Sequence, residues 1–176
     1  NNTAVGHQAL QANTSASNNT AVGYQAGYSN TTGVNNDSFG YKANYTNATT
    51  NGNSAFGNGA LQLNSSGYYN AAFGAAALQA NTSGTSNVAL GMQALTSNTT
   101  GNNNTAIGAW TGGSAAALAG NSTGSSNVAV GNNALGSNTT ASYNTAVGYQ
   151  AAYSNTTGER NIAIGHTALT SNTTGV

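Results

Sequence analysis

The side chains that could do acid–base or metal chemistry are few in this 176-residue chain. Its charged and imidazole side chains are Asp37, Lys42, Glu159, Arg160, His7 and His166. There is no Cys, which excludes a disulfide framework, a thiolate zinc site and a cysteine nucleophile. With zero net charge and two basic residues, the chain also lacks the basic surface needed to bind nucleic acid or an anionic membrane.

These groups cannot be brought together by the repeat array described below. Asp37 and Glu159 fall about seven coils apart, roughly 34 Å along a solenoid axis, whereas paired glycosidase carboxyls lie within about 10 Å. His7 and His166 lie in the first and last copies of the repeat, so no Ser-His-Asp or Cys-His set can assemble. We therefore expect no enzymatic activity, no cofactor and no metal site.

The element that positions every side chain is a 17-residue repeat, N-x-A-φ-G-x-x-A-L-x-x-N-x-[ST]-G-x-x, where φ is apolar. Ten copies fill residues 1–176 as a single array, and one copy has 23 residues instead of 17. Its six extra residues lie between Gly108 and Leu118, around Trp110, and predict an outward loop. Positions are numbered below from the first Asn of the repeat, and coil 1 begins at Asn2.

The repeat predicts an all-β fold, a parallel β-solenoid of ten coils. A small residue at position 3 precedes a large apolar one at position 4, as in Ala4 and Val5, which suits a short strand with one face inside and the other tightly covered. The glycine at position 5 then permits a turn. A second short strand is expected at positions 8 and 9, for example Ala94 and Leu95. One copy buries too little to fold alone, whereas stacked copies about 4.8 Å apart form a continuous core.

Two rows of asparagines run through the repeat. Stacked amides at position 1 are expected to form an axial hydrogen-bonded ladder: Asn2, Asn19, Asn36, Asn53, Asn70, Asn87, Asn104, Asn127, Asn144 and Asn161. At position 12 each Asn begins an N-x-[ST] triplet, the acceptor of N-glycosylation: Asn13, Asn30, Asn47, Asn64, Asn81, Asn98, Asn121, Asn138, Asn155 and Asn172. We expect a row of glycans there, and the alternative is a hydrogen-bonded turn copied by duplication.

The first and last copies share one phase, so a following copy would continue the 17-residue rhythm. We expect end-to-end stacking of chains into a head-to-tail filament, or a segment of a longer array. His7 and His166 would become neighbours at such a junction, as a ring stack, a metal clip or a pH switch. Trp110 is the candidate contact with a partner, unless its ring folds back into the bulged coil.

The strings NTAVG (2–6), NVALG (87–91) and NIAIG (161–165) resemble the head repeats of trimeric autotransporter adhesins, and similar repeats occur in phage tail-fibre proteins. The resemblance implies a left-handed parallel β-roll with three chains side by side, displayed on a bacterial surface to bind host or matrix. The small residues at position 3 would either let such chains approach closely or mark a narrow coil interior. No apolar stretch approaches the roughly 20 residues that span a bilayer, so membrane insertion is not expected.

These features predict a structural subunit of an extracellular filament, made of further copies of this chain and carrying covalent glycans. The alternative is a surface adhesin or phage tail-fibre head that binds a receptor. An ice-binding solenoid ranks third, because the Thr column at position 2 is interrupted by Asp37, Val88, Val128 and Ile162.

Overall fold

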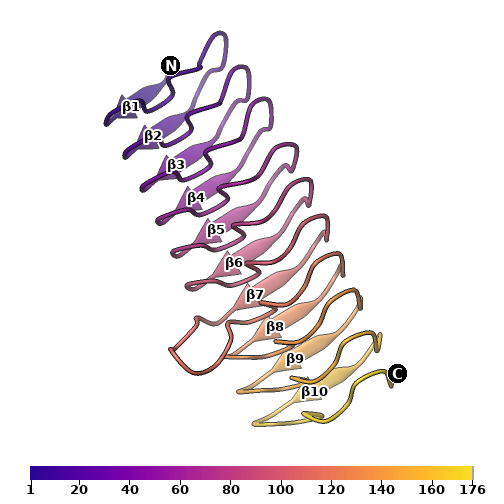
Figure 1. The fold of residues 1–176 in the computed structure, drawn as a ribbon. Helices are drawn as coiled ribbons and strands as arrows, with labels where there is room; N and C mark the ends of the chain where they lie inside the picture. The colour runs from indigo at the N-terminus through magenta and orange to yellow at the C-terminus, as the bar shows by residue number, and fades with distance from the viewer. Residues whose placement is uncertain (176) are drawn as a thin grey trace.

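The computed structural model describes residues 1–175 and confirms the all-β parallel solenoid (Figure 1). Within these residues, ten three-residue strands form one parallel sheet in chain order. They are β1 (Thr3–Val5), β2 (Thr20–Val22), β3 (Asp37–Phe39), β4 (Ser54–Phe56), β5 (Ala71–Phe73), β6 (Val88–Leu90), β7 (Thr105–Ile107), β8 (Val128–Val130), β9 (Thr145–Val147) and β10 (Ile162–Ile164).

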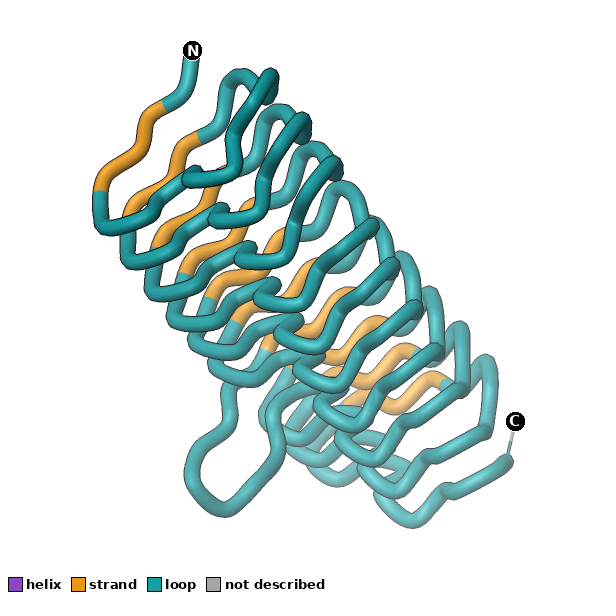
Figure 2. The backbone as a smooth tube through the Cα atoms, turned by 45° about the horizontal axis from the view of Figure 1, so that its top comes forward, coloured by secondary structure: helices purple, strands orange, loops and turns teal. Residues whose placement is uncertain are grey.

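The strands pair so that equal repeat positions lie next to one another along the axis. Ala21 pairs with Ser38, and across the long coil Thr105 pairs with Val128. The six extra residues therefore leave the register unchanged. They form a loop that projects from the stack between β7 and β8 (Figures 1 and 2).

The core is narrow and consists of small side chains. From β2 to β10 the position-3 Ala or Ser points inward and is at most 2% exposed. These residues pack against the buried Ala of position 8 and Leu of position 9, such as Ala94 and Leu95. The position-3 row therefore marks a narrow coil interior rather than a surface on which chains meet.

The second strand predicted at positions 8 and 9 is wrong. Ala94 and Leu95 lie in a turn, and Leu95 has a left-handed φ of 52°. Gln93, two residues earlier, has φ 62°, and strands do not contain such values. The chain bends here because the coil must close within 17 residues. The Leu95 N–H still donates to Ala117 O of the next coil at 3.1 Å.

The large apolar residues of position 4 face outward. Successive strand residues point to opposite sides, so positions 2 and 4 lie on the face opposite the buried position 3. Phe73, Leu90 and Ile107 are 39%, 48% and 36% exposed. The expectation that this second face is tightly covered is wrong for the single chain.

Candidate functional site

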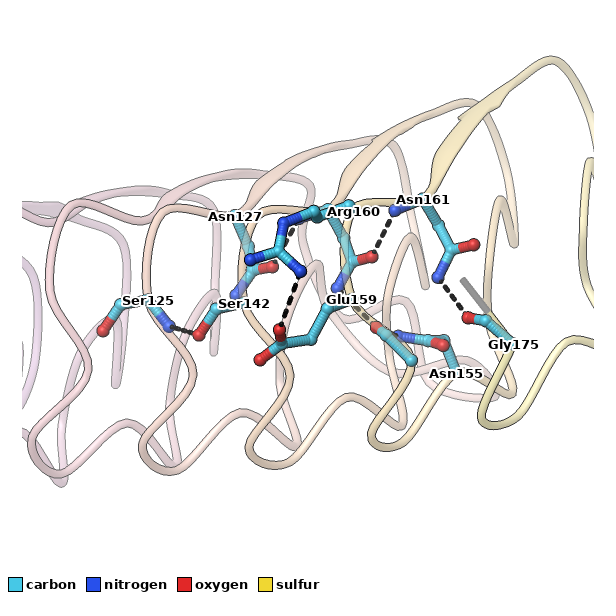
Figure 3. A network of polar contacts seen from close by, with 10 residues as sticks. Ser125, Asn127, Ser142, Asn155, Glu159, Arg160, Asn161 and Gly175 are labelled. Carbon is cyan, nitrogen blue, oxygen red and sulfur yellow. Dashed lines mark hydrogen bonds and ion pairs between the residues drawn. The ribbon is translucent and has the colours of Figure 1, made fainter.

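The axial ladder predicted at position 1 is present as hydrogen bonds in all ten coils. From Asn2 to Asn144 each Oδ1 accepts the backbone N–H of the next position-1 Asn at 2.9–3.0 Å. Each Nδ2 donates to the position-15 carbonyl of its own coil at 2.7–3.0 Å. Each amide thus holds its own turn closed and binds its coil to the next one. Figure 3 shows this arrangement at Asn161, which donates to Gly175.

Asn13, in the first coil, is half-buried and its N-glycosylation stays a prediction, whereas burial opposes a glycan on the inner members of the position-12 row. Its members from Asn30 to Asn155 are at most 1% exposed. Asn98 is representative, because its Nδ2 donates to Gly101 O at 3.0 Å and to Asn81 Oδ1 of the preceding coil at 2.9 Å. A glycan on this nitrogen would replace one of these two donor hydrogens and would have to leave through a closed turn. Asn172 makes the same two kinds of bond at the last coil.

The position-12 row is instead a second hydrogen-bonded ladder. From Asn81 to Asn172 each Nδ2 donates to the Oδ1 of the preceding position-12 Asn at 2.8–3.2 Å. The alternative interpretation, a hydrogen-bonded turn copied by duplication, accounts for the triplets.

A third row was not among the residues predicted from sequence. At position 13 a Ser or Thr hydroxyl donates to the backbone carbonyl of position 13 in the next coil, as Thr82 does to Thr99 at 3.0 Å. Ser122 and Thr139 repeat the contact across the following coils. The sequence does contain a sign of this row, because position 13 is Ser or Thr in every coil except at Ala48.

The two histidines are the outer members of aromatic stacks at opposite ends of the rod. The ring of His7 lies 5.5 Å from that of Tyr24, which lies 5.3 Å from that of Tyr41. At the other end Tyr149 stacks on His166 at 5.2 Å. Ring stacking within each end is confirmed, whereas contact between His7 and His166 stays a prediction that requires two rod ends to meet.

The loop of coil 7 presents Trp110 to solvent. Trp110 is 42% exposed, so its side chain is not enclosed within the coil. The base of the loop is fixed, because the Trp110 N–H donates to Met92 O at 3.0 Å. Asn132 Nδ2 also donates to Ala109 O at 2.7 Å and to Thr111 Oγ1 at 3.1 Å. A fixed base under a projecting, exposed aromatic side chain suits a contact surface.

The charged side chains make one ion pair and contacts with aromatic rings within the described residues. Glu159 and Arg160 make an exposed ion pair of 3.6 Å (Figure 3), which contributes little to stability. Lys42 Nζ lies 5.4 Å and 5.2 Å from the rings of Tyr41 and Tyr45. Residues 1–175 show no pocket, and no three His, Cys, Asp or Glu among them gather where they could hold a metal ion.

Comparison of the chain with protein-family models, with curated proteins and with solved structures gives no match. The described part of the chain contains no helix long and apolar enough to cross a bilayer. Its parallel β-solenoid is compatible with β-roll repeat proteins. The features that bear on function are therefore the ladders, the exposed faces and the projecting loop.

Proposed function

We propose that this chain is a structural rod whose coils stack end to end into an extracellular filament. The observation that supports this is the unbroken position-1 ladder, in which every coil offers the next one the same acceptor in the same register. The extracellular placement is part of the same proposal and draws on the resemblance to surface-displayed head repeats.

The last coil offers the groups that every other coil uses for stacking. Asn161 Nδ2 closes its own turn through Gly175 O, as in the other coils. Its Oδ1 accepts no hydrogen bond from residues 1–175, whereas the Oδ1 of Asn144 accepts the Asn161 N–H at 2.9 Å. A further coil, from a second chain or from the same one, would satisfy it. The contact would join the last coil of one rod to the first coil of the next, and such a heterologous, head-to-tail contact generates open-ended fibres.

A single methyl group can test this stacking. A Cβ on Gly148 would lie 2.4 Å from Gly165 O of the next coil, whereas a Cβ on Gly165 meets no atom within 4 Å. Gly165→Ala therefore places the methyl where an incoming coil would lie. Its positive φ of 121° adds backbone strain of about 1–3 kcal/mol. Gly148→Ala is the matched control, with the same strain but a clash inside the rod.

We expect wild-type rods to lengthen with concentration in electron micrographs and in sedimentation. Gly165→Ala should remain short with an unchanged circular dichroism spectrum, whereas Gly148→Ala should lose thermal stability. End-to-end stacking would be refuted if wild-type rods stayed single at every concentration. It would also be refuted if folded Gly165→Ala rods lengthened as much as wild-type rods.

Receptor binding is a second candidate, favoured by the exposed ring of Trp110 on its projecting loop. In this case the rod is the head of an adhesin or tail fibre. Trp110→Ala should abolish binding to immobilised host-matrix proteins or glycans while leaving the thermal midpoint unchanged. Equal binding by wild type and Trp110→Ala would rule out this loop as the contact.

A further inference from the structure

We propose that two of these rods pair face to face, in opposite directions, through the outward position-4 residues of the sheet. This surface is called the apolar column. Its members are Val5, Val22, Phe39, Phe56, Phe73, Leu90, Ile107, Val130, Val147 and Ile164. The pairing is lateral and does not depend on end-to-end stacking.

The apolar column is continuous along the described rod. Phe39, Phe56 and Phe73 stack on one another with ring centroids 4.6 and 4.8 Å apart. Leu90 and Ile107 extend the column and are 48% and 36% exposed. Contiguous exposed apolar surface of this kind marks an interaction site.

The area of the sheet face is large enough for a weak, reversible contact with a partner. Ten strands about 4.8 Å apart, each three residues of about 3.3 Å, give a face of about 480 Å² per rod. Two faces in contact bury about 960 Å², close to the lower limit of about 1,000 Å² for a specific interface. The pairing of single 176-residue rods is therefore expected to be reversible.

The periodicity of the face selects a second copy of this chain as its occupant. The rows of side chains on one solenoid can fit between those on another, because the strands of both repeat about every 4.8 Å. An α-helix repeats every 5.4 Å or so and would drift out of register by about 6 Å over ten coils. The face carries only one charge, Asp37 in β3, so it offers little to a partner recognised by charge.

The sizes of the side chains select the antiparallel direction. Rotation about an axis parallel to the strands sets position 4 against position 4 and coil 3 against coil 8. Phe39, Phe56 and Phe73 then face the smaller Val130, Ile107 and Leu90 of the other rod. Parallel pairing in register needs rotation about the rod axis, which reverses the strands and would set position 4 against position 2, with Phe39 opposite Asp37 of the other rod.

Two charge variants on the same coil test whether the apolar column is the interface. Leu90→Lys places a charge on the column, and Thr100→Lys places one on an exposed turn of coil 6. Sedimentation velocity at low micromolar concentration should show reversible wild-type dimers. Leu90→Lys should weaken dimerisation at least 100-fold, and Thr100→Lys should leave it unchanged. Since neither substitution touches a stacking site at a rod end, end-to-end growth should be equal in both.

Spin labels determine the direction of the pair, because the native chain has no Cys. Thr32→Cys and Thr157→Cys lie at exposed position 14 of coils 2 and 9. In antiparallel pairs, Thr32→Cys labels on two rods should be offset by about 34 Å along the axis. Mixed rods with one label of each kind should show no axial offset. Parallel pairs would reverse the two results.

Three measurements can overturn or support the pairing of rods. Wild type that is monomeric up to 100 µM or so, or dimers that survive Leu90→Lys, would overturn the apolar column as an interface. A reversed label pattern would overturn the antiparallel direction. Asp37→Thr gives an independent readout, and Thr is a native residue at this position in coils 1 and 2. Because the substitution removes the only charge on the face, it should tighten the dimer.

Discussion

Replacement of one ladder amide, Asn87→Ala, should cost the protein about 2–4 kcal/mol of unfolding free energy. Asn87 Oδ1 accepts the Asn104 N–H at 3.0 Å, and this buried N–H makes no other hydrogen bond within residues 1–175. A buried donor without an acceptor lowers the unfolding free energy by about 1–3 kcal/mol. Asn87 Nδ2 also donates to Gly101 O at 2.9 Å, and the loss of this bond adds about 1 kcal/mol, since Asn98 still donates to the same oxygen.

The assay is urea unfolding followed by circular dichroism, with Thr100→Ala as the control in the same coil. The Thr100 side chain is exposed, so its loss should change the unfolding free energy by about 0.5 kcal/mol or less. Hydrogen exchange should show that the Asn104 amide becomes unprotected first, because each coil is stabilised by its neighbours. Equal unfolding midpoints for Asn87→Ala and Thr100→Ala would refute the role of the ladder.

Three further outcomes are expected. Leu95→Ala, in the core, should cost about 2–5 kcal/mol in urea unfolding, whereas Leu63→Ala, on the surface, should cost about 0.5 kcal/mol or less; similar losses for both would contradict the assigned core. Removal of residues 110–115 recreates the GAAAL string of residues 74–78 and should leave the thermal midpoint within a few degrees, because loop closure costs little; a collapse of the midpoint would show that the loop supports the fold. Asn87→Asp buries a carboxyl whose pKa rises above its usual value near 4, because burial disfavours the charged form. Its destabilisation should therefore be smaller at pH 3 than at pH 7, and the opposite order would contradict burial of this site.

The repeat length and the fixed glycine were sufficient to predict the solenoid, but residue types did not reveal the backbone at positions 8 and 9. Ala94 and Leu95 have the same small–large pattern as the true strand residues Ala89 and Leu90. Coil closure places Leu95 in left-handed backbone, against the ordinary preference of Leu. This constraint acts over the whole coil and is invisible in a pair of residues.

The same pattern also failed to indicate which side of the strand is inside. Hydrophobicity alone favours burial of Leu90 over Ala89, yet Ala89 is fully buried and Leu90 is 48% exposed. Alternation along a strand assigns residues to two faces without saying which face is the interior. The coil is too narrow for two large side chains, and its Leu95 already fills the core.

The N-x-[ST] triplets were misleading because a local motif contains no information about burial. Asn98 has an acceptor sequence, but its amide closes the turn through Gly101 and extends the ladder to Asn81. The ladder at position 1 could be predicted because the same amide recurs once per coil in a stack. That reasoning applied equally to position 12.

Electron cryomicroscopy of the purified chain over a range of concentrations tests the central claim most directly. The account predicts thin rods that lengthen by addition at their ends, with a layer line near 4.8 Å from the stacked coils. Compact particles, or rods of fixed length without that layer line, would contradict it.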